Sequence, residues 1–167
     1  MNLREIQKPL KDGYRTNPES SRITLVARGG QGDAPIACSV DLGRAIYAAQ
    51  AHAGVGGAGT GACSGDLLLG ALAACAQVTC QMVSASMELP TQEIRVTVEG
   101  DLDLAGTLGI GDARVGFESI RLDFDIVAPD ATQAQIDSLM EKTKRYCVVL
   151  QTLQAPPTIE THLISRT

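Results

Sequence analysis

Apolar residues dominate one long stretch in the middle of the chain, residues 66–88, with the sequence DLLLGALAACAQVTCQMVSASME. Ala, Leu, Met and Gln, all good helix formers, make up most of this stretch, and it contains no proline. Its apolar residues cover most of the circumference of a helix, whereas a surface helix keeps one polar stripe. We therefore expect a central helix over 66–88 that is buried nearly all round and ends before Pro90.

The segments on either side of this stretch alternate between apolar and polar residues, which is the period of a β-strand. Residues 22–40 predict a first hairpin, with its turn at Gly29–Asp33, and residues 93–127 predict a second hairpin. The polar residues 1–20 are expected to form an irregular arm. The alternation at residues 158–165 predicts a last strand.

Helical patterning returns near the C-terminus. Asp130 is expected to cap a helix with Gln133 as its capping-box partner, because the two lie three residues apart. This helix and a shorter one after it fill residues 131–154. Since the strands come in pairs and do not alternate one by one with helices, the order favours a single α+β domain over residues 1–167.

Composition narrows the function classes. Hydrophobic residues make up 44% of the 167 residues but aromatic residues only 3%, so the core is aliphatic and stacking on bases is not expected. The formal charge is −5 with no long basic cluster, which argues against nucleic-acid binding. The N-terminus has no apolar signal core, so we expect a cytoplasmic protein. Gln and Ser residues interrupt the central helix, and no membrane span is expected.

Five cysteines are the most reactive side chains in the sequence. No pair of them shows the CxxC spacing of a structural zinc site, so no metal is expected. The glycine-rich residues 54–65 fit neither a P-loop nor a dinucleotide-binding turn, so no cofactor is expected. In a cytosolic chain the cysteines are then thiols, either packed or reactive.

Most buried cysteines are small hydrophobic residues, and this interpretation suits Cys38, Cys63 and Cys80. Cys147 has a different setting, because it follows a basic helix end and begins a new helix. The unpaired amides at a helix start lower the pKa of a thiol there. We therefore expect a lowered pKa for Cys147.

Two segments carry a resemblance to a known family. SGDLLLGALAACAQVT at residues 64–79 is similar to the central-helix signature of the OsmC/Ohr family, and KRYCVVLQTL at 144–153 resembles its second signature, built around a Tyr-Cys pair. The order of hairpin, central helix, hairpin, helix and strand also matches that family over nearly the whole chain.

The resemblance implies an OsmC-like fold in which β-hairpins pack around a long central helix, within an intertwined homodimer. It also implies a thiol-dependent peroxidase that reduces organic hydroperoxides, a peroxiredoxin activity used in the oxidative stress response. Cys75 matches the peroxidatic thiol of the family and Cys147 the resolving thiol. An external dithiol would be the reductant, and no cofactor would be needed.

The sequence departs from the family near the first cysteine. Active members carry a Glu ten residues before that cysteine, where this chain has Gly65, and the nearest acid is Asp66. The Arg that such a Glu orients is expected from the N-terminal region, where Arg28 is the first candidate, followed by Arg44 and Arg22.

A second function stays open at this point. The same fold without catalysis would bind a lipophilic small molecule in an apolar pocket around Cys75. The glycine at position 65 favours this binding protein, whereas the pair Cys75 and Cys147 favours the peroxidase.

Overall fold

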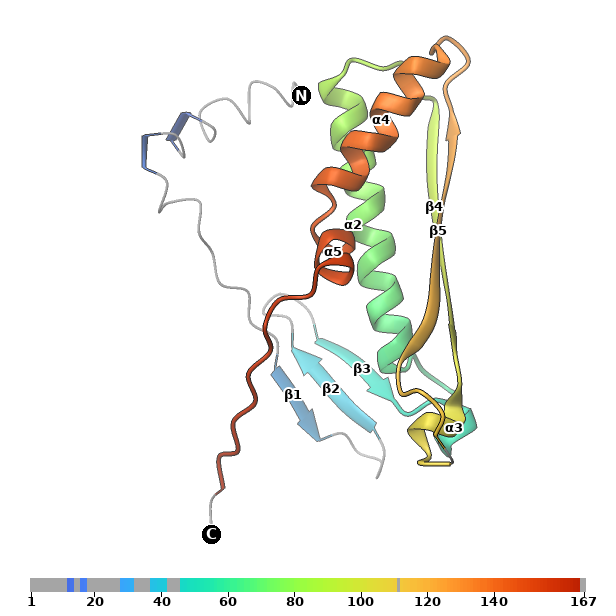
Figure 1. Cartoon of the computed structure of the whole chain (residues 1–167), viewed down its shortest axis with the longest axis vertical. Helices are drawn as coiled ribbons and strands as arrows, with labels where there is room; N and C mark the ends of the chain where they lie inside the picture. The colour runs from blue at the N-terminus through green and yellow to red at the C-terminus, as the bar shows by residue number, and fades with distance from the viewer. Residues whose placement is uncertain are drawn as a thin grey trace.

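The structure is a computed structural model that describes residues 12–13, 16–17, 28–31, 37–41, 46–110 and 112–165, with only the backbone described for 28–31 and 37–41. Its architecture is α+β, as the sequence predicts. A long helix runs through the molecule, a two-stranded ribbon lies along one side of it, and two shorter helices lie along another (Figure 1). A separate three-stranded sheet lies near one end of the long helix (Figure 1).

The long helix is α2, Ser64–Ser86. It begins where the Asp66 carboxylate accepts a hydrogen bond from the Cys63 amide at 2.8 Å, which satisfies one of the unpaired donors at a helix start. It ends four residues before Pro90, and the Leu89 amide donates to the Ser84 carbonyl at 3.0 Å across this end. The helix predicted over 66–88 is therefore present, shifted by two residues.

The ribbon consists of β4, Glu93–Leu102, and β5, Phe117–Val127, which pair antiparallel. The short helix α3, Leu104–Thr107, lies in the connection between them. Apolar residues of the ribbon alternate with polar ones, and the apolar face packs on α2 and on α4 and α5 beyond it. These core-facing residues include Val96, Val98, Ile120, Leu122 and Phe124.

Two helices follow the ribbon, α4 at Gln133–Tyr146 and α5 at Val148–Gln154. The predicted cap of α4 at Asp130 is wrong by two residues. Asp130 lies in a turn closed by the Ala131 amide on the Ala128 carbonyl, and Thr132 is the cap. The spacing of the predicted capping box is right, since Thr132 pairs with Gln135 three residues on.

The small sheet has the order β1-β2-β3, formed by Arg28–Gln31, Ala37–Asp41 and Ile46–Gln50, all antiparallel. The predicted hairpin is present in its described part, but residues 29–31 of the turn predicted at 29–33 belong to β1, and residues 32 and 33 lie outside the described residues. Gly29 and Gly30 pair with Val40 and Ser39 within the strands. Gly29 and Gly30 were a poor indicator of a turn, because glycine is tolerated inside a strand as well as in a turn.

The C-terminal strand predicted at 158–165 is not formed. The chain runs on from α5 as an exposed, irregular segment that leads away from the helices (Figure 1). Within the described residues no strand lies beside it to accept its hydrogen bonds. Ile159, Leu163 and Ile164 are 80%, 92% and 84% exposed, so the alternating apolar face has no cover in the single chain.

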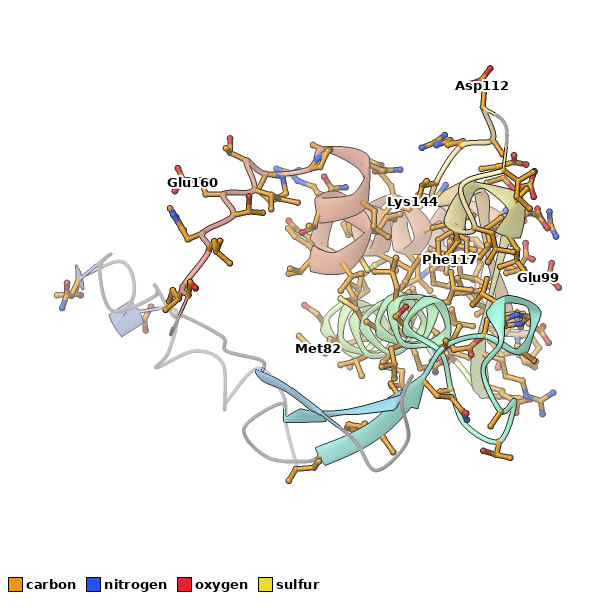
Figure 2. The ribbon with its side chains drawn as sticks, turned by 90° about the horizontal axis from the view of Figure 1, so that it is seen from below. Met82, Glu99, Asp112, Phe117, Lys144 and Glu160 are labelled. Carbon is orange, nitrogen blue, oxygen red and sulfur yellow. The ribbon has the colours of Figure 1, made fainter. Side chains whose placement is uncertain are left out.

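One face of α2 is also uncovered by the described residues, so the helix is not buried nearly all round. Leu68, Val78 and Met82 are 39%, 53% and 42% exposed, although all three are large and apolar. Viewed along the helix, Met82 lies on the side of α2 turned away from Phe117 and the ribbon (Figure 2). The sequence shows that this face is apolar but does not show what covers it.

By length and composition alone, α2 would also serve as a membrane span. In the structure it packs against β4, α4 and α5, while the face with Leu68, Val78 and Met82 stays uncovered by the described residues. A polar side chain takes part in this packing, since the Gln77 amide donates to the Ile94 carbonyl of β4 at 2.8 Å.

Candidate functional site

The two cysteines singled out by the sequence meet in the core. Cys75 projects from the middle of α2, and Cys147 is the single residue that joins α4 to α5. Their side chains lie in one cluster with Leu72 and Ala76, and a hydrogen bond from Cys147 contributes to the lowered pKa of Cys75. Both are free thiols in this structure. Residues 72 positions apart in the sequence are thus neighbours without any rearrangement of the fold.

Packing fixes the position of Cys147. Its side chain is 0% exposed and lies in a cluster with Leu72 and Ala76 of α2, whereas Cys75 is only half-buried. The Cys147 backbone is extended, so α4 stops there and α5 starts anew. This break directs the first amides of α5 toward α2.

Those amides act on Cys75. Partial burial is the largest single influence on its pKa and by itself would raise it, because burial penalises a charged sulfur. Hydrogen bonds from the Val149 amide, the Cys147 thiol, the Thr79 hydroxyl and the Val148 amide together outweigh burial. The pKa of Cys75 is therefore lowered, and the thiolate of the pair forms on Cys75.

The expectation of a lowered pKa for Cys147 is wrong. Burial is the largest influence and raises the pKa of the Cys147 thiol, and the interaction with Cys75 adds to this rise. The Leu150 and Val149 amides lower the pKa, as expected at a helix start, but they do not outweigh burial. The sequence shows that the amides are unpaired and does not show how deeply the thiol is buried.

Within the described residues, burial and hydrogen bonds set the pKa of Cys75, and no guanidinium or ammonium group contributes. Arg28 begins β1, and its side chain is outside the described part of the chain, as are Arg22 and Arg44 entirely. Their predicted role beside the thiolate stays a prediction. The sequence interpretation missed Thr79, although its spacing of four residues after Cys75 is the signal that places both on one helix face.

Asp66 and the glycine at position 65 lie at the start of α2, away from the thiol pair. The Asp66 carboxylate caps α2, and the hydrogen bond from the Cys63 amide lowers its pKa. A Cβ added at Gly65 would lie 3.3 Å from Phe117 Cζ and 3.5 Å from Cys63 Sγ. A carboxylate at position 65 would therefore enter the space between α2 and the ribbon, ten residues before Cys75 in the sequence.

That space is a cavity of about 880 Å³ at the N-terminal end of α2. Its walls are mainly apolar, with Leu68, Leu69, Leu104 and Phe117 among them, and His52 and Cys63 also line it. A second, more polar cavity of about 310 Å³ lies at the other end of α2. Neither of these two cavities is lined by Cys75, so the apolar pocket expected around that thiol stays a prediction.

The remaining described cysteines are separated from this pair. Cys80 is fully buried beside Thr143, and burial raises its pKa, which suits a packing role. Cys63 lines the cavity at the start of α2. Within the part of the chain that the structure describes, no three His, Cys, Asp or Glu residues converge as metal ligands.

Comparison with known proteins identifies the family. A sequence model of the OsmC-like protein family matches residues 57–162, which include α2, both thiols and the ribbon. The chain belongs to the OsmC-like protein family. A search of curated proteins finds no significant match.

Solved structures agree with this OsmC-like fold at low sequence identity. An OsmC-like protein from Mycoplasma pneumoniae has a TM-score of 0.65 at 16% identity, covering 80% of this chain and 89% of its own. An organic hydroperoxide resistance protein OsmC from Legionella pneumophila has 0.61 at 17%, covering 81% and 92%. An organic hydroperoxide resistance protein from Elizabethkingia anophelis has a TM-score of 0.60 at 21% identity, covering 81% of this chain and 91% of its own.

The opposite pKa displacements predict an order of thiol reactivity. Because alkylation consumes the thiolate, Cys75 should react with iodoacetamide at a lower pH than Cys147. Peptide mass spectrometry of the folded, reduced protein over a pH series gives the midpoint for each cysteine. Buried Cys80, whose pKa is raised, is the internal control and should react late. Alkylation of Cys147 ahead of Cys75 would contradict this assignment.

Proposed function

We propose that this OsmC-like protein is a thiol-dependent peroxidase that reduces organic hydroperoxides through Cys75 and Cys147. The observation that carries the proposal is the contact of two thiols with opposite pKa displacements, one favouring thiolate and the other retaining its proton. Two of the similar solved structures are described as organic hydroperoxide resistance proteins, which supports the same substrate class.

The first step uses the lowered pKa of Cys75. Its thiolate attacks the terminal oxygen of the hydroperoxide, so an S–O bond forms while the O–O bond breaks. The leaving alkoxide takes up a proton and departs as an alcohol, and Cys75 becomes a sulfenic acid. Two electrons pass from sulfur to the peroxide, and no metal or organic cofactor is required.

The second step uses the contact with Cys147. The Cys147 sulfur attacks the sulfenic sulfur of Cys75, and its proton leaves with the hydroxyl group as water. The product is a disulfide between α2 and the α4–α5 junction. An external dithiol then reduces this disulfide in two exchange steps and restores both thiols. Since all four described cysteines are thiols, the proposal suits a reducing compartment such as the cytoplasm.

The uncovered face of α2 supports a homodimer as the working form. Positions 68, 71, 75, 78, 82 and 85 follow steps of three and four residues, the spacing of a seam between paired helices. The ribbon has only two strands, which is few for a sheet that is stable on its own. The exposed C-terminal segment alternates apolar and polar residues, as a strand without a partner would. Cys75 lies on this seam, so a second copy would exclude water from the thiolate.

Binding of a lipophilic molecule is the second candidate function. The observation that favours it is the cavity of about 880 Å³ with mainly apolar walls at the start of α2, apart from the thiol pair. Binding in this cavity would not depend on Cys75. Loss of turnover on substitution of Cys75 therefore separates the two functions.

The peroxidase predicts different fates for the two cysteines. Cys75→Ser should reduce turnover of cumene hydroperoxide with dithiothreitol to the uncatalysed rate, because the attacking sulfur is lost. Cys147→Ser should instead stop at the sulfenic acid and accumulate over-oxidised Cys75, detected by mass spectrometry. Cys38→Ser, Cys63→Ser and Cys80→Ser are the controls and should keep nearly full turnover. Wild-type turnover that survives Cys75→Ser would refute the mechanism.

The dimer predicts a large effect of charge on the seam. Val78→Glu should weaken association by roughly 30- to 1,000-fold, because burying an unpaired carboxylate in an apolar interface costs on the order of 2–4 kcal/mol. Light scattering after size-exclusion chromatography at micromolar concentration measures the mass. Ala134→Glu, at an exposed position of α4, is the matched control and should leave the dimer intact. A folded wild-type monomer at this concentration would contradict the proposal.

A further inference from the structure

Thr79 lies one helical turn after Cys75 in α2. It follows Cys75 by four residues within α2, so the two side chains lie one above the other on the same face of the helix. Both side chains are half-buried. Threonine is branched at Cβ, which restricts its side chain to few rotamers and holds the hydroxyl near the helix.

The Thr79 hydroxyl has one proton and two acceptors within reach. A threonine inside a helix commonly donates to the carbonyl four residues earlier, which here is the Cys75 carbonyl. The hydroxyl also lies one helical turn from Cys75 on the same face of α2, and it contributes to the lowered pKa of that thiol. A neutral thiol is a weak acceptor, but a thiolate carries a full charge and forms a stronger, charge-assisted hydrogen bond. Ionisation of Cys75 therefore favours the sulfur as the acceptor.

A charged sulfur in an apolar setting needs such donors. The Cys75 side chain packs in the same apolar cluster as Leu72, Val149 and Leu150, which offer no charge. The donors that converge on it are the Val148 and Val149 amides, the Cys147 thiol and the Thr79 hydroxyl. Among these donors Thr79 alone offers a side chain that can be removed without touching the backbone or the second thiol.

We propose that Thr79 stabilises the Cys75 thiolate by donating its hydroxyl hydrogen bond to the sulfur, acting together with the amides at the start of α5. This donor set supplies, from neutral groups, stabilisation that a guanidinium would otherwise provide. Thr79 does not exchange atoms with the substrate and is a positioning residue. Its effect on thiol ionisation stands on the structure alone, and its effect on hydroperoxide reduction rests on the proposed function.

The test compares Thr79→Val, which keeps the shape and removes the hydroxyl, with Thr79→Ser, which keeps the hydroxyl. The readout is the pH midpoint of Cys75 alkylation by iodoacetamide in the folded, reduced protein. A charge-assisted hydrogen bond contributes about 1.5–3 kcal/mol, so Thr79→Val should raise the midpoint by about one to two pH units. Alkylation well below the midpoint should slow by about 10- to 100-fold and recover at high pH, whereas Thr79→Ser should match wild type.

Thr143→Val is the matched control, because it removes another buried threonine hydroxyl that lies beside a different thiol, Cys80. The Cys75 midpoint should not change in this variant. Thr79→Ala provides a second hydroxyl deletion that favours the helix and should raise the midpoint as Thr79→Val does.

An unchanged Cys75 midpoint in folded Thr79→Val and Thr79→Ala would overturn the inference and assign the hydroxyl to the backbone carbonyl. A shifted midpoint that Thr79→Ser fails to restore would also overturn it, because packing would then be the cause. Oxidation by cumene hydroperoxide on the same variants tests the proposed function separately. A shifted midpoint without any oxidation faster than that of free cysteine would keep the role of Thr79 and reject the peroxidase.

Discussion

The contact between Cys75 and Cys147 depends on how the α4–α5 junction packs against α2. Cys147 is fully buried against Leu72 and Ala76, so the junction cannot shift without opening the core. The same packing ends α4 at an extended residue and directs the first amides of α5 at the facing sulfur. One apolar contact therefore brings the two thiols together and supplies the donors that separate their protonation states.

Cys75 and Cys147 have chemically identical side chains, but their surroundings shift the pKa values of the two thiols in opposite directions. Cys75 is half-buried, receives several donors and has a lowered pKa, whereas Cys147 is enclosed by apolar groups and has a raised pKa. In the proposed peroxidase, the enclosed thiol would keep its proton until the resolving step, when that proton would leave with water. The half-buried thiol lies on the uncovered seam of α2, where the proposal places the approach of the hydroperoxide and the packing of a second chain.

Periodicity made much of the fold predictable. The apolar run of α2 and the alternation of β4 and β5 are local signals, and these elements lie within about two residues of their predicted bounds. The cap of α4 was placed two residues early because Asp130 is a good cap by type but lies in the preceding turn. The strand predicted at 158–165 can form only beside a neighbouring strand, and a local sequence pattern does not show whether one is present. In the same way, the apolar pattern of α2 does not show which surface covers its exposed face.

The meeting of the two thiols could be predicted from the sequence, but their electrostatics could not. The two sequence signatures single out Cys75 and Cys147, which share one cluster. The pKa direction expected for Cys147 was wrong because burial outweighs the amides at the start of α5. The Thr79 spacing was visible in the sequence, but its meaning depends on the same packing.

The central claim is that Cys75 is a thiolate poised to attack a hydroperoxide. Stopped-flow oxidation of the reduced protein by cumene hydroperoxide near neutral pH measures this directly, with free cysteine at the same pH as the reference. The account predicts that the wild-type protein is oxidised at least about tenfold faster than free cysteine, since its thiolate fraction is larger and its donors are preorganised. A rate no faster than that of free cysteine, unchanged by Cys75→Ser, would contradict it and leave ligand binding as the function.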